Sequence, residues 1–488
     1  MKPVLVSGLL GGILLFSGCK KMEQKFDSQK PNILFIVVDD LGWSDLGCYG
    51  ADLHETPNID RFAEESVIFT NSYAAAPVCS PTRASIMTGK YPARLNFTIW
   101  SEAASPAERK DQSIYKYLPP QTVENLPFEE VTLAEKLKEN GYLTAHIGKW
   151  HIGDLVHFPE TQGFDVSVAA SQRGAPPTFF YPYKGFAFGE LRFVGQLGSD
   201  PEGRYFTDRK GEYLTDRLTD EALKIIEDAG SHPFFLNLCY YSVHTPIEAK
   251  EQDIEHFKSK LSSELHHQNA TYAGMVKAVD DNVGRILKKL KETGADENTI
   301  VFLLSDNGGY INKFKDNTVT NNYPLNSGKG SLYEGGVRIP TIVSLPHNSF
   351  NGKVETPVST IDFYPTLMDI LSVKDYPKMD GKSFLSLLKG GTNEELQARK
   401  MFWHYPHYYP TTTPVSAIRD GNWKMLEYLG DERLELYDLS TDLGETKNLA
   451  DEMPEKAAEL LEKLHAWQEE TNAGKVTLNP DFPGNEKK

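Results

Sequence analysis

The sequence predicts an α/β fold in which a large mixed, mostly parallel β-sheet is flanked by helices, with a smaller α+β C-terminal subdomain. Three observations carry this prediction. Continuous apolar, β-branched runs at 32–38 and 299–305 have the composition of strands buried on both faces of a parallel sheet. Residues 272–290 place apolar side chains at helical spacing. Residues 417–426 and 435–439 alternate apolar and polar residues on either side of a turn, which predicts an antiparallel sheet.

The length of 488 residues predicts more than one domain. We predict a large domain over residues 31–395 and a C-terminal subdomain over residues 396–488. The boundary is placed where the composition turns polar and Gly-containing, near residues 390–400. In the C-terminal subdomain an antiparallel hairpin should be followed by a helix over residues 454–470.

Residues 1–19 have the pattern of a signal peptide of the bacterial lipoprotein kind. Lys2 precedes an apolar run, and small residues then lead to Cys19. We therefore expect an exported protein, a periplasmic or cell-surface lipoprotein of a Gram-negative-type bacterium, with lipid on Cys19 and a tether over residues 20–30. Simple cleavage and secretion is the alternative, because Phe16 stands where such signals usually have Leu.

Charge and apolar content limit the partners. No later stretch reaches 18 apolar residues, so we predict no transmembrane helix and a membrane contact only through the lipid anchor. The formal net charge of −17 argues against nucleic acid as a partner, because the negatively charged protein and the phosphate backbone would repel each other. An anionic substrate must therefore be held by local cations. Cys48 and Cys239 are either a disulfide or, by default, two separate thiols.

A helix is predicted to begin next to Cys79. Ser80 can cap it, Pro81 suits its first turn, and Gly89 can end it in a left-handed conformation. Cys79 would then lie at a helix N-terminus, where backbone amides favour an anion, and Arg83 returns to the same end one turn later. An ordinary capped helix with a buried thiol is the alternative.

Two of the predicted strands end in acidic and amide side chains. Asp39 and Asp40 follow the first strand, and Asp306 and Asn307 follow the strand at 299–305. The carboxyl ends of strands are where open α/β sheets place their ligands. The four oxygen-bearing side chains suit a hard cation, and the flexible carboxylate and amide mixture favours Ca²⁺ over Mg²⁺. A solvated loop is the alternative for each pair alone.

Basic residues follow two further predicted strands. The strand at 142–147 leads into Lys149 and His151, which are two apart on an extended segment and therefore face the same way. His244 follows the strand at 234–241 within three residues. Each of these side chains alone would more often be structural.

Together these segments resemble the motifs of the type I, formylglycine-dependent sulfatases, which belong to the alkaline phosphatase-like superfamily. The sequence C-x-P-x-R followed by A-S-x-x-T-G begins at Cys79, and G-K-W-H contains Lys149 and His151. The sequence H-x-P begins at His244. Lys329 precedes E-G-G-x-R-I-P, which is similar to the family's second long motif. The resemblance covers nearly the whole chain after residue 30.

The resemblance implies a site and a chemistry. It implies that a separate maturation enzyme oxidises Cys79 to formylglycine, whose hydrate is the nucleophile, with Asp306 as the candidate base. The implied catalytic residues are Cys79, Arg83, Lys149, His151, His244 and Lys329. The implied ligands of the divalent cation are Asp39, Asp40, Cys79, Asp306 and Asn307. Lys149, His244 and Lys329 would contact the sulfate group, and residues 31–395 would be the catalytic domain.

The resemblance also implies a sulfated carbohydrate, a glycan or oligosaccharide, as the substrate. His404 and His407 could line its pocket, in a segment similar to bacterial enzymes that act on galactose or N-acetylgalactosamine 4-sulfate. Two alternatives stay open. One is a phosphatase, phosphodiesterase or phosphonate hydrolase of the same superfamily, whose two-zinc forms need further Asp and His ligands. The other is a non-catalytic glycan-binding lipoprotein in which Cys79 stays a thiol.

Overall fold

The computed structural model describes residues 30–105, 112–181, 183, 193–194, 211–347 and 350–483. The expected signal peptide, Cys19 and residues 20–29 of the expected tether lie outside these ranges, so the lipid anchor stays a prediction. None of the helices in the described ranges has both the length and the apolar character that crossing a membrane requires. Cys48 and Cys239 are free thiols, so they do not form a disulfide.

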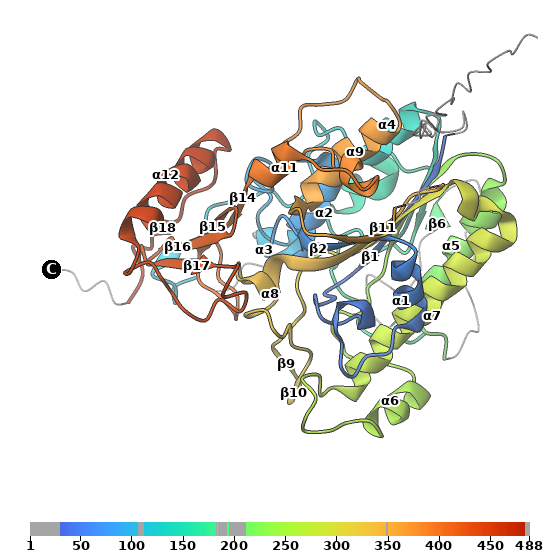
Figure 1. Ribbon diagram of the computed structural model, residues 1–488, viewed down its shortest axis with the longest axis horizontal. Helices are drawn as coiled ribbons and strands as arrows, with labels where there is room; N and C mark the ends of the chain where they lie inside the picture. The colour runs from blue at the N-terminus through green and yellow to red at the C-terminus, as the bar shows by residue number, and fades with distance from the viewer. Residues whose placement is uncertain are drawn as a thin grey trace, which may run out of the picture. The chain divides into compact units, whose positions relative to one another are not determined.

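A large sheet forms the centre of the structure (Figure 1). In the described residues it has ten strands in the order β12-β2-β11-β8-β1-β7-β4-β5-β6, with β13 beside β2. The middle strands β8, β1, β7, β4 and β5 run parallel, and β11 is antiparallel to both of its neighbours. The predicted mixed, mostly parallel sheet is therefore confirmed. Its strands are β1 (Asn32–Val38), β2 (Val67–Tyr73), β4 (Leu143–Gly148), β5 (Val166–Val168), β6 (Phe193–Val194), β7 (Phe234–Cys239), β8 (Thr299–Ser305), β11 (Arg338–Ser344), β12 (Gly352–Val354) and β13 (Val358–Ser359).

Strand β1 shows why its sequence is apolar throughout. Leu34, Ile36 and Val38 pack into one core cluster, whereas the alternate residues Phe35 and Val37 pack into another on the opposite face. Helices cover both faces, so neither set of side chains meets solvent. The first face carries α1 (Pro57–Glu64), α5 (Leu214–Ala229) and α7 (Ala270–Thr293), with α6 (Glu251–Lys258) against α7. The second carries α2 (Cys79–Thr88), α4 (Leu133–Glu139), α9 (Phe363–Ile370), α10 (Leu385–Leu388) and α11 (Glu394–Ala398).

Shorter elements connect these layers. They are the helices α3 (Ser101–Ala104) and α8 (Glu334–Val337), the strand pairs β3 (Tyr117–Leu118) with β18 (Thr477–Leu478) and β9 (Lys313–Phe314) with β10 (Asn317–Thr318), and 3₁₀ turns at Gly47–Tyr49, Leu155–His157, Pro159–Thr161, Ala295–Asn298 and Thr360–Asp362.

The start of α2 differs from the prediction. The N-cap residue is Val78, and the Ser80 hydroxyl donates instead to the backbone oxygen of His151 at 2.5 Å. The Ser80 hydroxyl therefore does not accept a hydrogen bond from a backbone amide of its own helix. It links the helix to the segment after β4 instead. The predicted end is confirmed, since Gly89 has a φ of 67°.

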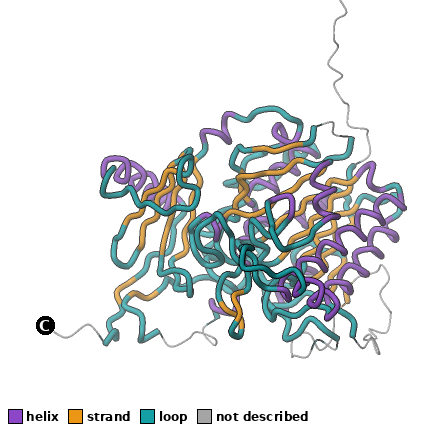
Figure 2. The backbone as a smooth tube through the Cα atoms, turned by 60° about the horizontal axis from the view of Figure 1, so that its bottom comes forward, coloured by secondary structure: helices purple, strands orange, loops and turns teal. Residues whose placement is uncertain are grey.

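A second, antiparallel sheet of four strands lies in the C-terminal region, separate from the central sheet (Figure 2). Its strands are β14 (Lys400–Tyr405), β15 (Val415–Asp420), β16 (Trp423–Tyr428) and β17 (Leu434–Asp438), and α12 (Pro454–Glu470) covers it. The predicted long strand at 417–426 is divided in two, because Gly421 adopts a φ of 61° in a tight turn. The other face of this sheet packs on residues around β2 and α8. The boundary at residues 395 and 396 stays a prediction.

A buried ion-pair network joins the C-terminal sheet to α8. The Lys424 Nζ atom lies 2.8 Å from Glu334 Oε1 and 3.0 Å from Glu445 Oε1. The Tyr73 hydroxyl donates to Glu334 Oε2 at 2.7 Å. Removing one partner of such a network would leave an unpaired buried charge, at a cost of about 3–5 kcal/mol.

This network predicts a dependence of stability on pH. Burial, aided by the Glu334 carboxylate, raises the pKa of Glu445 from 4.5 to about 7 although Lys424 opposes the shift. The folded protein therefore keeps a proton that the unfolded chain loses, so stability should fall as pH rises from about 4.5 to about 7. We expect Glu445→Gln to remove about 1–3 kcal/mol of that fall, measured by denaturant unfolding at several pH values. Glu452→Gln, at an exposed glutamate, is the control. An unchanged pH slope in Glu445→Gln would contradict this prediction.

Candidate active site

The candidate active site lies where several strands of the central sheet end. Asp39 and Asp40 follow β1, and Asp306 and Asn307 follow β8. The neighbouring parallel strands β4 and β7 lead into Lys149 and His244, and α2 begins at Cys79. Parallel strands bring their carboxyl ends to one edge, and for that reason residues far apart in the sequence meet here.

The centre of the site is a cluster of buried carboxylates around Cys79. One side-chain ligand atom from each of Asp39, Asp40, Cys79 and Asp306 lies within 4.8 Å of all the others. The Asn307 Nδ2 atom donates to Asp40 Oδ1 at 2.8 Å, whereas Asn307 Oδ1 is buried and has no hydrogen-bond partner among the described residues. A buried amide oxygen without a partner, next to three carboxylates, fits an oxygen-bound hard cation such as Ca²⁺.

Three cations face these three carboxylates. Lys149 Nζ lies 2.7 Å from Asp39 Oδ2, and Lys329 Nζ lies 2.7 Å from Asp40 Oδ1. Burial raises the pKa of Asp39 to about 8 even with Lys149 beside it. Lys329 and His244 overcome the effect of burial on Asp40 and hold its pKa well below the usual range. Because Asp39 is not fully stabilised in its charged form by Lys149, a further cation beside it would be bound favourably.

The third cation, Arg83, holds one of the carboxylates of the cluster in place. Its Nε atom donates to Asp306 Oδ2 at 2.8 Å, and its Nη1 atom donates to the backbone oxygen of Lys149 at 2.8 Å. The predicted return of Arg83 to the start of α2 is confirmed. These two hydrogen bonds hold Asp306 and the segment after β4 in place.

The Cys79 side chain is surrounded by these charges. Its Sγ atom donates to Asp39 Oδ1 at 3.4 Å and accepts a hydrogen bond from Lys329 Nζ at 3.3 Å. Burial raises the pKa of the Cys79 thiol well above its ordinary value, despite the two lysines. The thiol is therefore neutral at neutral pH, and the site does not generate a reactive thiolate.

Two histidines flank the cluster in different ways. His244 Nε2 lies 3.6 Å from Asp40 Oδ2, and burial together with Lys329 lowers the pKa of His244 to about 3. His151 Nε2 contacts Glu102 Oε2 at 2.5 Å, and Glu102 Oε1 accepts from the Gly174 amide at 2.8 Å. A side-chain carbon at position 174 would lie 2.3 Å from the His151 ring, so glycine is required there.

Comparisons with known proteins agree with this geometry. The model of the family described as "Sulfatase" matches residues 31–373, and a model described as "N-sulphoglucosamine sulphohydrolase, C-terminal" matches residues 327–473.

The chain belongs to the sulfatase family.

Three relatives show how far the similarity of this sulfatase extends. A protein from Formosa agariphila named "Sulfatase" is 32% identical, over 96% of this chain and 94% of that protein. Human N-acetylgalactosamine-6-sulfatase is 32% identical, over 80% of this chain and 74% of that protein. The crystal structure of Ps i-CgsB in complex with k-i-k-neocarrahexaose is 29% identical with a TM-score of 0.74, and the match covers 90% of this chain and 93% of that one. The family predicted from the sequence motifs is confirmed, and the protein is a sulfuric ester hydrolase.

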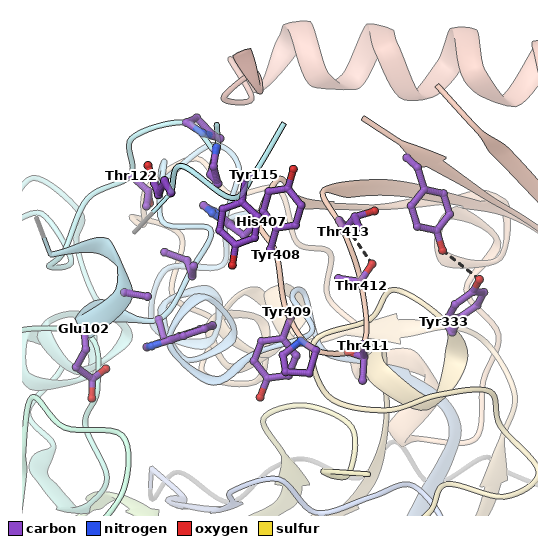
Figure 3. A pocket seen from close by; sticks show the side chains of 18 of the residues that line it. Glu102, Tyr115, Thr122, Tyr333, His407, Tyr408, Tyr409, Thr411, Thr412 and Thr413 are labelled. Carbon is purple, nitrogen blue, oxygen red and sulfur yellow. Dashed lines mark hydrogen bonds between the residues drawn. The ribbon is translucent and has the colours of Figure 1, made fainter. Parts of the chain in front are cut away.

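A wide pocket of this sulfatase adjoins the site (Figure 3). It has a volume of about 1100 Å³, and its lining includes Glu102, Tyr409 and Thr411. Thr411 Oγ1 donates to the backbone oxygen of Lys329 at 2.8 Å, and Glu102 contacts His151, so both walls touch site residues. Aromatic rings line much of the remainder: Trp100, Tyr115, Tyr333, Tyr408 and Tyr428.

The structure places the two histidines predicted to contact substrate in different surroundings. His407 lines this pocket, with Nε2 2.8 Å from Thr98 Oγ1. His404 lies instead on β14 beside a smaller cavity of about 260 Å³. Its ring nitrogens contact Ser416 Oγ at 2.7 Å and the Gly474 backbone oxygen at 2.8 Å. His404 therefore does not line the wide pocket together with His407, contrary to the prediction.

Glu102 is the site residue of this sulfatase that sequence reasoning missed. It lies on α3, a helix of four residues, and is not part of any of the recognised motifs. Its role arises from a contact across 49 positions in the sequence, to His151. The only signal in the sequence is a single acidic residue in a neutral segment, which does not predict such a contact.

Proposed function

We propose that this sulfatase removes sulfate from a sulfated carbohydrate, with a formylglycine made from Cys79 as nucleophile and one divalent cation beside it. The observation that carries the proposal is the group of three buried carboxylates around Cys79, with the unpartnered Asn307 oxygen next to them. Asp39, Asp40, Asp306 and Asn307 would hold the cation together with residue 79. The flexible mixture of carboxylate and amide ligands favours Ca²⁺ over Mg²⁺.

The charge balance of the site supports an anionic substrate. Asp39, Asp40 and Asp306 are formally balanced by Lys149, Lys329 and Arg83, all of them buried. A divalent cation would add two positive charges to this balanced set. A sulfate ester brings the compensating negative charge, and fixed cations stabilise the further charge that develops as the sulfur–oxygen bond breaks.

The chemistry divides among a few side chains. The hydrated formylglycine would supply the hydroxyl that attacks sulfur, and Asp306 would take the proton that this hydroxyl loses. Lys149 and Lys329 hold the sulfate oxygens, and His244 gives a proton to the departing sugar oxygen. His244 is neutral without a ligand, and a bound anion next to it raises its pKa. His151, oriented by Glu102, takes the proton from the second hydroxyl when sulfate is expelled.

The pocket next to the site supports a sugar substrate. Tyr115 and Tyr408 lie against each other (Figure 3) and stack with ring centroids 3.9 Å apart. Trp100 meets Tyr409 edge-on, with ring centroids 5.7 Å apart. Rigid aromatic rings with a few polar groups between them suit the apolar faces and hydroxyl groups of sugar rings. The names of two relatives also indicate sugar ligands: one is an N-acetylgalactosamine-6-sulfatase, and the other is a structure in complex with k-i-k-neocarrahexaose.

We further propose galactose or N-acetylgalactosamine 4-sulfate as the sulfated unit. A panel of mono- and disaccharides sulfated at single positions tests this, with sulfate release as the readout and the matching sugar phosphates as controls. Release from 4-sulfated galactose-type sugars is expected. Release of sulfate from position 6 alone would show that position 4 is wrong. Release only from glucosamine or uronic acid units would contradict galactose or N-acetylgalactosamine as the sulfated sugar. Phosphate release would favour the phosphatase alternative.

Removing the metal should remove activity. We expect dialysis against a chelator to abolish sulfate release, because the sulfate group and the three carboxylates lose the charge that holds them together. Added Ca²⁺ should restore activity better than Mg²⁺. Measurement of bound metal by mass spectrometry of the active protein checks the assignment. Two zinc ions in the site would contradict it and support a phosphatase-type centre.

The contact between Glu102 and His151 makes a further prediction. Glu102→Gln keeps an oxygen for His151 Nε2 but removes the charge that favours the imidazolium, so kcat should fall by about 10²-fold, the lower end for acid–base catalysis. The pH profile of kcat should shift as well, which a purely structural role would not cause. Glu129→Gln, at an exposed glutamate, is the control. Unchanged kcat and pH profile in Glu102→Gln would contradict the role.

The N-terminal pattern adds a location to the proposal. We propose an exported lipoprotein anchored through Cys19, matured by a formylglycine-generating enzyme. Cys19→Ala should move the protein from the membrane fraction to the soluble fraction of its host. Recovery of both forms in the same fraction would refute the anchor.

A further inference from the structure

A second cluster of metal-binding side chains lies outside the sulfate site. Asp45, His54 and His267 each offer a ligand atom within 4.8 Å of the others, and all three residues are buried. They come from the loop after β1, from the segment before α1 and from the segment before α7. The roles assigned above to the site residues do not involve any of the three.

The distances inside this cluster are unusual for hydrogen bonds. His267 Nε2 lies 3.4 Å from Asp45 Oδ1, and His54 Nδ1 lies 3.6 Å from the same oxygen. N–H···O hydrogen bonds usually span about 2.7–3.2 Å. The ligand atoms of a tetrahedral Zn²⁺ ion, at metal distances of about 2.0–2.1 Å, lie about 3.3 Å apart. The separation between His267 Nε2 and Asp45 Oδ1 therefore fits a shared metal ion better than a direct hydrogen bond. His54 Nδ1 would exchange its contact with the Asp45 backbone oxygen, at 3.0 Å, for the metal ion.

The contacts of the His267 ring also favour a metal ion. It is 3% exposed, and in the part of the chain that the structure describes its Nε2 atom has no hydrogen-bond partner. Its other nitrogen, Nδ1, contacts Asp52 Oδ1 at 2.6 Å. A carboxylate on the far nitrogen is the usual outer contact of a metal-binding histidine, because it fixes the ring and leaves the near nitrogen for the metal.

The remaining partners hold the other two ligands in place. Asp45 Oδ2 accepts from the Tyr272 hydroxyl at 2.5 Å and from the Gly42 amide at 2.7 Å. His54 Nδ1 lies 3.0 Å from the backbone oxygen of Asp45.

We propose that Asp45, His54 and His267 bind a second metal ion, a transition metal of the Zn²⁺ class. Two imidazoles and one carboxylate suit Zn²⁺, in contrast to the oxygen ligands of the sulfate site. The proposal does not depend on which ester the enzyme hydrolyses.

The metal would have a structural role. Tyr272 on α7 contacts Asp45 and also lies with its hydroxyl 3.4 Å from the backbone oxygen of Asp40. Thr320 donates to Asp45 Oδ1 at 2.7 Å. An ion at Asp45 would therefore fasten the loop that carries Asp40 to the start of α7 and to the segment around residue 320.

Metal analysis of the full-length protein tests the proposal. The protein is loaded with Zn²⁺ in the presence of Ca²⁺, dialysed against buffer without zinc, and analysed by mass spectrometry. We expect about one retained Zn²⁺ per chain. Loading with Co²⁺ should give the strong visible absorption of a tetrahedral site. Retention of no zinc and the absence of this absorption would overturn the proposal.

Variants locate the ion. His54→Gln and His267→Gln should each lose the retained Zn²⁺ and the Co²⁺ absorption, whereas His232→Gln, at an exposed histidine, should keep both. Asp306→Asn should lose Ca²⁺ and keep Zn²⁺, because it alters only the sulfate site. Zinc retained by His54→Gln and His267→Gln as fully as by the wild type would overturn the assignment. If these variants fail to fold, the decision rests on the wild-type protein, where a tetrahedral Co²⁺ spectrum supports the site and its absence refutes it.

Discussion

Cys79→Ala will abolish sulfate release, with a loss of kcat/KM of more than about 10⁴-fold. Alanine at this position cannot be converted to formylglycine. The Sγ atom contacts Asp39, Asp40 and Lys329, and none of these three side chains has a hydroxyl or thiol group that could replace the nucleophile. The measurement is the initial rate on a sulfated sugar and on an aryl sulfate, at equal protein concentrations. Both substrates should lose activity to the same degree, because both need the nucleophile.

Two controls accompany this prediction. The melting temperature of Cys79→Ala should stay close to the wild type, since Lys329 keeps its contact with Asp40 at 2.7 Å. Ca²⁺ should still bind through Asp39, Asp40, Asp306 and Asn307, but more weakly, because one ligand is lost. The peptide that contains residue 79, isolated from the native host, should have the mass of the aldehyde. Full activity of protein whose Cys79 is an unmodified thiol would contradict the proposed nucleophile.

His244→Gln will reduce kcat on sugar sulfates by about 10²–10⁴-fold, the range typical of a general acid. A sugar alkoxide is a poor leaving group and needs the proton from His244, whereas a nitrophenolate leaves without one. The loss should therefore be much smaller on nitrophenyl sulfate. Rates on both substrates, measured across pH, give the comparison.

The control for this prediction is His465→Gln, because His465 is exposed on α12 and contacts Glu427 at 2.7 Å. It should show wild-type rates on both substrates. Equal losses on the sugar and nitrophenyl substrates in His244→Gln would contradict a role as acid. They would indicate instead that His244 only helps to bind the sulfate group.

The parts of the fold that could be predicted are those fixed by local pattern. Strands β1 and β8 and helix α12 have the predicted bounds, because continuous apolar runs and helical periodicity do not depend on distant contacts. Strand β11 was not predicted. It contains Pro340, which argues against a strand inside a sheet, and the register shift between Ile339 and Thr341 accommodates it.

The candidate site divides in the same way. Residues inside recognisable motifs, such as Cys79 and Lys329, were assigned from the sequence, and the structure brings them together. The role of Glu102 and the hydrogen bond from Ser80 to the His151 backbone oxygen could not be predicted. Each depends on a contact with the segment at His151 that only the folded chain creates. His404 illustrates the opposite case, in which a motif suggests a contact that the structure does not make.

The segment between β14 and β15 has a consequence for how such enzymes diversify. Tyr408, Tyr409 and Thr411 lie on this one connection, between two strands of the C-terminal sheet, and none of them supplies a group to the carboxylate cluster. Substitutions at Tyr408 would change the pocket wall without removing a group of the carboxylate cluster, whereas Thr411 also supports the backbone of Lys329. Exchange of the segment around Tyr408 between related enzymes would therefore test how far this pocket wall decides which sugar is bound.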